Sequence, residues 1–170
     1  HSFDLWQGES DVNNLIPKMI DNLIKDKKIS IDSGAYVSNL ETEPRILITK
    51  SDGSYLYLTT DLATVLNRKR ENEIDKTLYI VDKRQKLHFE QLFNSIKYFQ
   101  FGKEEYTHVE FGTVNDLNGN PFKTRDGDTK KLTDLYAETF SKLKVINKDL
   151  DNETNKLLAN TVLTFSDLIT

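Results

Sequence analysis

The feature that most constrains the fold is the largely apolar segment 77–81. It has the length of a strand and ends at Asp82, which is typical of a strand buried on both faces of a parallel sheet. A second strand-like segment covers 108–114. Between the two, apolar residues recur at helical spacing: Phe89, Leu92, Phe93, Ile96 and Phe99. Strand, helix and strand predict a βαβ unit, whose crossover should be right-handed.

The rest of the chain completes an α/β pattern. Segment 15–24 has an apolar stripe at helical spacing, with Pro17 at its start. Short strand-like runs follow, and the last two, 45–49 and 55–59, predict a hairpin around the turn at 51–53. A short helix is then expected after Thr60 and Asp61, which are both good N-caps. Further elements are expected as strands at 29–31 and 35–38 and as helices at 132–143 and 152–165.

Composition narrows the class of protein. A chain of 170 residues fits one compact domain, and a net charge of -4 disfavours a broad basic face for nucleic acid. The absence of cysteine excludes disulfides and thiolate metal sites and agrees with a reducing cytoplasm. No secretory signal is visible, and no apolar run approaches the roughly 20 residues of a membrane span. We therefore expect a cytoplasmic protein without membrane contact.

Polar residues gather where the predicted strands end. In open α/β sheets, ligands bind at the carboxyl ends of the strands. Three polar clusters occupy such positions, at 57–61, 82–88 and 119–127. The fold is expected to bring them to one rim.

Three stretches closely resemble arginyl-tRNA synthetases in their residues, their order and their spacing. They are 51–63 (SDGSYLYLTTDLA), 79–89 (YIVDKRQKLHF) and 108–127 (HVEFGTVNDLNGNPFKTRDG). Segments 3–10 (FDLWQGES) and 33–35 (SGA) are also similar to upstream parts of that family. The resemblance implies a Rossmann-like class I catalytic domain, of which this chain is the C-terminal half, with parallel strands and crossover helices.

The activity implied is that of an arginine-tRNA ligase. Such enzymes use ATP to activate L-arginine as arginyl-adenylate and transfer the arginyl group to tRNA(Arg), with Mg²⁺ held through the ATP phosphates. No metal-binding residues are expected in this chain. Its histidines are His1, His88 and His108, so the family's first signature, of the His-x-Gly-His type, is absent. Residues 1–170 therefore resemble a fragment without that motif, the N-terminal domain or the anticodon-binding domain, and we expect it to be inactive alone.

The resemblance implies an arginine pocket made of Tyr57, Asp61 and Gln85. A planar guanidinium is best recognised by a carboxylate that accepts two parallel hydrogen bonds, which is the role implied for Asp61. Tyr57 would contact the same group through its hydroxyl, and Gln85 would reach the α-amino end. From the residues alone, Asp61 could equally be an N-cap, Tyr57 a cross-strand packing residue and Gln85 an ordinary helix-start residue.

The segment 121–127 (PFKTRDG) stands in the place of the second class I signature, usually written KMSKS. Lys123 would neutralise charge on the ATP phosphates during adenylation, and Arg125 could share that role. Outside the family context, such a segment would be read as a solvated turn, and His108 as a structural residue. The residues implied for ATP binding lie on the 108–114 strand and in the following loop: His108, Phe111, Gly112, Thr113, Phe122 and Lys123.

Two other functions compete with the enzyme. A non-catalytic arginine-binding or interaction module could keep the pocket, but the match at both Asp61 and Lys123 favours catalysis. Another class I nucleotidyl transferase could share the half-fold, but the trio Tyr57, Asp61 and Gln85 favours arginine. The oligomeric state stays open.

Overall fold

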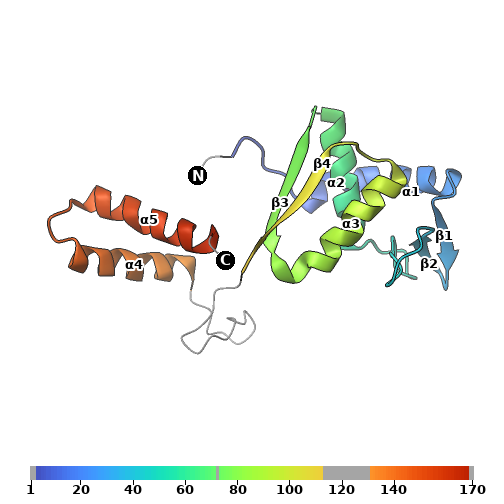
Figure 1. Cartoon of the computed structure of the whole chain (residues 1–170). Helices are drawn as coiled ribbons and strands as arrows, with labels where there is room; N and C mark the ends of the chain where they lie inside the picture. The colour runs from blue at the N-terminus through green and yellow to red at the C-terminus, as the bar shows by residue number, and fades with distance from the viewer. Residues whose placement is uncertain (1–2, 72, 113–130, 169–170) are drawn as a thin grey trace. The chain divides into compact units, whose positions relative to one another are not determined.

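The computed structural model describes residues 3–71, 73–112 and 131–168. Contacts divide the chain into two compact units, one of His1–Tyr79 and Arg84–Val109, the other of Ile80–Lys83 and Glu110–Thr170. The expectation of one compact unit is therefore not met. The reason is that the two C-terminal helices, at the red end of the chain in Figure 1, pack chiefly against each other.

The first unit opens with two helical segments, η1 (Glu9–Leu15) and α1 (Ile16–Lys25). Pro17 occupies the first turn of α1, where its missing N–H costs no hydrogen bond, and Ile16, Met19 and Leu23 are buried. The predicted helix at 15–24 is confirmed. Both segments pack against α2 (Tyr57–Glu71), which forms the centre of this unit.

A small hairpin follows α1. β1 (Ile29–Asp32) pairs antiparallel with β2 (Ala35–Ser38), and Asp32 lies opposite Ala35. The two turn residues between them, Ser33 and Gly34, have φ of 51° and 84°. Positive φ at both central residues is the conformation that a tight two-residue hairpin requires.

The predicted hairpin of 45–49 with 55–59 is wrong. Only isolated bridges form there, Val37 with Leu47 and Thr49 with Tyr55, and α2 begins at Tyr57. The helix starts early because Leu58, Leu62 and Val65, spaced by four and three residues, are all buried on one face. The Thr59 hydroxyl also donates to the Ile48 carbonyl, which anchors the first turn of α2 to the preceding segment.

The predicted βαβ unit is confirmed, although its second strand begins at Glu105 rather than at the expected residue 108, and Gly112 lies outside it. β3 (Lys76–Asp82), η2 (Lys83–Gln85), α3 (Lys86–Phe99) and β4 (Glu105–Phe111) follow one another, and β3 pairs with β4. The Glu105 N–H donates to the Asp75 carbonyl, and the Lys76 ammonium pairs with the Glu105 carboxylate at 2.7 Å. Because these contacts join the beginnings of both strands, the strands run parallel.

Burial of β3 differs from the prediction. The α3 side chains Phe89, Leu92 and Ile96 are buried beneath the sheet, but Leu78 and Ile80 on alternate positions of β3 are 51% and 60% exposed. Successive strand residues point to opposite faces, so only one face of β3 is covered by the described part of the chain. The prediction that this apolar run is a strand buried on both faces is therefore wrong for the described part of the chain.

The second unit contains a helical hairpin of α4 (Leu132–Ile146) and α5 (Asn152–Leu168). Both helices match predicted ones. Ala159 and Asn155 of α5 are buried, and the Asn155 amide donates to the Leu150 and Asp151 carbonyls at 3.1 and 3.0 Å. Within the described ranges, no helix is long and apolar enough to cross a membrane.

Candidate functional site

Tyr57 and Asp61 occupy the first turns of α2. They are four residues apart, so both side chains lie on one face of the helix. Tyr57 is 74% exposed and does not pack across a strand pair. Asp61 is the fifth residue of α2 and therefore does not cap it. The structure thus excludes both alternatives, which were cross-strand packing for Tyr57 and helix capping for Asp61.

A short polar contact joins α2 to α3. His88 Nε2 lies 2.6 Å from Asp61 Oδ2, and the two side chains are 26% and 33% exposed. We did not predict a role for His88 from sequence. Its position three residues after Gln85, on the same helical face as a predicted ligand, was the signal that could have found it.

Gln85 ends η2 and immediately precedes α3. It occupies the N-cap position, but its exposed side chain makes no capping hydrogen bond. The pairing of Asp61 with His88, one helical turn beyond Gln85, therefore brings the three predicted arginine residues into one region of the first unit. Tyr57 and Asp61 come from the first turns of α2 rather than from a strand end, whereas Gln85 lies in the short segment between the end of β3 and the start of α3.

His108 on β4 belongs to an aromatic cluster. Its ring centroid lies 4.7 Å from that of Phe89, which in turn lies 5.0 Å from Tyr79 and 6.0 Å from Phe93. These contacts support a packing role for His108, whatever else it does.

Tyr79 lies between this cluster and the charged end of α2. Burial raises its pKa above the ordinary value of 10.0, against the opposing effect of the Arg68 cation, whose guanidinium lies 5.9 Å from the ring centroid. The Asp61 carboxylate adds to the upward shift. Tyr79 is therefore held neutral beside the predicted arginine pocket.

The predicted ATP residues are only partly described. Phe111 ends β4 and Gly112 follows it, both in the second unit. The predicted Thr113, Phe122, Lys123 and Arg125 lie outside the described residues.

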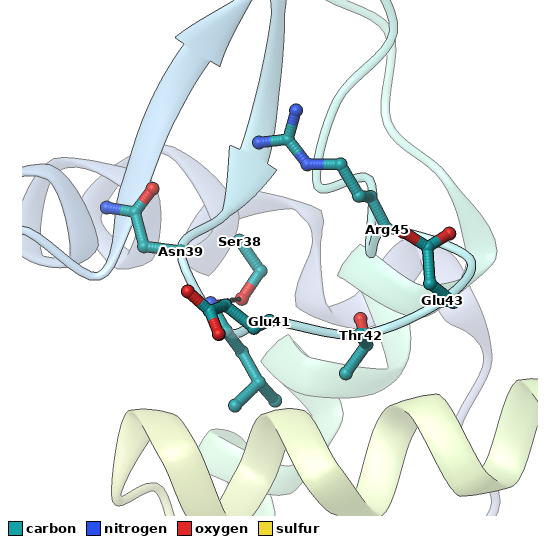
Figure 2. A pocket seen from close by; sticks show the side chains of 7 residues that line it. Ser38, Asn39, Glu41, Thr42, Glu43 and Arg45 are labelled. Atoms are coloured by element: carbon teal, nitrogen blue, oxygen red, sulfur yellow. Dashed lines mark hydrogen bonds between the residues drawn. The ribbon is translucent and has the colours of Figure 1, made fainter.

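A separate cavity lies beside the β1–β2 hairpin. Figure 2 shows its lining side chains, which come from the end of β2 and the loop after it and include the carboxylates of Glu41 and Glu43. Its volume is about 640 Å³, and it contains none of the predicted site residues. In the described ranges, no group of three or more acidic or histidine side chains is arranged to hold a metal ion.

The family comparison identifies a class I aminoacyl-tRNA synthetase catalytic domain. A family model described as "tRNA synthetases class I (R), catalytic domain" matches residues 2–166. The chain belongs to this family, the arginine-specific class I synthetases.

Curated relatives agree with the family. An arginine–tRNA ligase of Francisella tularensis subsp. tularensis is 40% identical across 98% of this chain and 30% of the relative. That of Alkaliphilus oremlandii is 42% identical across 89% of this chain and 27% of the relative. The chain thus spans less than a third of the length of the curated relatives it matches.

Solved structures support the fold. An arginyl-tRNA synthetase from Plasmodium falciparum superposes with a TM-score of 0.71 at 22% identity, covering 96% of this chain and 29% of the other. A putative arginyl-tRNA synthetase from Campylobacter jejuni gives a TM-score of 0.66 at 17% identity, covering 82% and 31%.

Proposed function

We propose that this chain is the arginine-binding part of the catalytic domain of an arginine-tRNA ligase. The observation that carries the proposal is the packing of α2 against α3, which pairs Asp61 with a residue one turn beyond Gln85. The chain is then a fragment, 1–170, of a class I catalytic domain, and its full activity depends on the parts that the relatives add. Family membership also supports a cytoplasmic location.

Arginine recognition follows from the chemistry of these side chains. The Asp61 carboxylate is about one third exposed, so a ligand can reach it, yet it is shielded enough for an ion pair to be stronger than on an open surface. The guanidinium would bind it through two parallel N–H donors. The Tyr57 hydroxyl, one turn before, would contact the same end of the substrate, and the uncommitted Gln85 amide would accept from its α-amino group.

Adenylation requires attack of the substrate carboxylate on the α-phosphate of ATP, with pyrophosphate leaving. Because this step depends on positioning and on stabilising negative charge, cationic side chains are the chief contribution expected of the protein. We assign that role to Lys123, with Arg125 beside it, and ATP contacts to His108, Phe111, Gly112, Thr113 and Phe122. Mg²⁺ would enter with ATP, bound to phosphate oxygens and water rather than to a carboxylate cage. tRNA(Arg) would accept the arginyl group.

Replacing Asp61 tests the pocket. In the complete ligase, Asp61→Ala should raise the KM for arginine by roughly a hundredfold or more, the size of a lost charged partner in a semi-buried pair, and leave the KM for ATP nearly unchanged. Arginine-dependent pyrophosphate exchange measures both. Asp21→Ala, an exposed aspartate on α1, is the matched control. Equal losses for arginine and ATP would contradict the assignment.

Replacing Lys123 tests catalysis. Lys123→Ala should lower the pyrophosphate-exchange kcat by about a hundredfold with little change in arginine affinity, because the cation acts on charge that develops in the transition state. Lys142→Ala, an exposed lysine on α4, controls for loss of positive charge. An unchanged exchange rate would remove Lys123 from the mechanism.

Titration calorimetry of this chain separates a fragment from an independent binding module. Binding of L-arginine but not L-lysine, without turnover, would show that the pocket forms alone, as a non-catalytic module would require. Absence of binding would show that the remaining parts of the ligase complete the pocket, and we expect this result or at most weak binding.

A further inference from the structure

The Asp61–His88 pair lies in the proposed arginine pocket. His88 Nε2 approaches Asp61 Oδ2 at 2.6 Å, which is hydrogen-bond distance. Both side chains are partly exposed, so a ligand can reach the carboxylate without removing the imidazole. The pair is also the link between the helix that carries Tyr57 and the helix that Gln85 precedes.

The carboxylate has capacity for both partners. Each carboxylate oxygen offers two lone pairs, so Oδ2 can accept from His88 and still accept one guanidinium N–H, while Oδ1 accepts the other. In that arrangement His88 fixes the plane of the carboxylate in which a bidentate guanidinium must lie.

His88 is itself held in place by its helix. The next residue, Phe89, is buried, and its ring meets that of His88 edge-on at 5.1 Å between centroids and 88° between planes. Leu92, one turn further, is fully buried. The imidazole is therefore fixed by a packed helix face rather than by a mobile chain end, which is the condition for it to orient another side chain.

We propose that His88 is a positioning residue for arginine recognition, holding the Asp61 carboxylate through its Nε2–H while the guanidinium binds the same group. This inference rests on the proposed arginine pocket and adds a residue to it. His88 acts through Asp61 and is not assigned a contact with the reacting atoms.

The test compares three substitutions in the complete ligase by arginine-dependent pyrophosphate exchange. His88→Ala should raise the KM for arginine roughly tenfold, as expected for one lost hydrogen bond to a charged group, with the KM for ATP unchanged. His88→Gln places an amide N–H near the position of Nε2 without a titratable ring, and should restore the KM for arginine to within about threefold of wild type. Gln91→Ala, a partly buried residue one turn along α3, should have no effect.

Other outcomes overturn the inference. If His88→Ala and His88→Gln are equally impaired, the hydrogen bond donated to Asp61 does not determine arginine binding. If His88→Ala raises both KM values and lowers the thermal midpoint, the residue is only structural. Asp61→Ala serves as the reference. If Asp61→Ala weakens arginine binding while His88→Ala does not, the positioning role of His88 is wrong but the proposed pocket is supported. If Asp61→Ala itself has no effect on arginine, the proposed pocket fails.

Discussion

At the residue scale, burial and hydrogen bonds to neighbouring side chains set the pKa values of two tyrosines. Tyr106 on β4 illustrates this, because its hydroxyl donates to the Glu104 carboxylate two residues before. Burial, followed by this hydrogen bond and the Glu104 charge, raises the pKa of Tyr106 well above the ordinary value of 10.0. Tyr79, in the same aromatic cluster, is shifted in the same direction.

These shifts predict how stability depends on alkaline pH. A group whose pKa is raised by folding contributes stability that is fully present below its unfolded pKa, near 10, and is lost as pH rises through the folded value. Urea unfolding of the chain should therefore show a fall in midpoint between pH 8 and pH 11. Tyr106→Phe should be less stable at pH 8 by roughly 1 kcal/mol, for the lost hydrogen bond, but should lose less on going to pH 11. A parallel decline in both proteins would refute the role of Tyr106.

Sequence reasoning nominates candidate residues but does not identify the side chains that they contact. Tyr57, Asp61 and Gln85 were identified through family resemblance, and the structure brings them into one region. His88 was missed because periodicity shows that two residues share a helix face, but not which residue of another helix each one meets. That information depends on how α2 packs against α3, a contact between residues 27 positions apart.

At the element scale, the start of α2 shows how two local signals compete. Tyrosine and threonine around 55–60 favour a strand. The buried positions Leu58, Leu62 and Val65 have helical spacing, and the helix prevails because it covers that stripe. The βαβ unit was predicted correctly because an apolar run of strand length comes before a segment with apolar residues at helical spacing, and a second strand-like segment follows it. The exposed face of β3 could not be predicted, since an apolar run does not reveal what covers it.

The end of α3 allows a stability prediction. Gln100 has φ of 60° and ψ of 36°, a left-handed conformation, and the next residue's N–H bonds back to the Ile96 carbonyl. Such helix ends favour glycine, since side-chain sterics penalise other residues there. Gln100→Gly should raise stability by about 0.5–1 kcal/mol, seen as a higher thermal midpoint. Gln100→Ala, which keeps Cβ, is the control. A similar gain from alanine would show that backbone strain is not the cause.

At the scale of the whole molecule, burial is unevenly distributed between the two units. The first unit buries a continuous set of apolar side chains from η1, α1, α2 and α3. In the described part of the second unit, Ala159 and Asn155 are the buried residues, and large apolar side chains such as Ile146, Leu157 and Phe165 are more than 60% exposed. A helical hairpin with so little burial has little tertiary stabilisation.

This difference predicts unequal hydrogen exchange. Amides of α4 and α5 should exchange at least roughly tenfold faster than those around Leu62 in α2 or Leu92 in α3, because local opening of the hairpin exposes little additional apolar surface. Peptide-resolved exchange monitored by mass spectrometry measures both units in one sample. Equal protection would mean that the hairpin is stabilised by contacts beyond those of its own two helices.

The anchor between Thr59 and the main chain of residue 48 has a consequence for sequence variation. The donor is a side-chain hydroxyl, while the acceptor is a backbone carbonyl that every residue type possesses. Positions 59 and 48 should therefore differ in the substitutions that they tolerate. Position 59 accepts little besides serine, whereas position 48 accepts any aliphatic residue that fills the fully buried volume of Ile48. In a saturation library selected for growth, the two positions joined by this one bond should give opposite profiles, one restricted by polarity and the other by size.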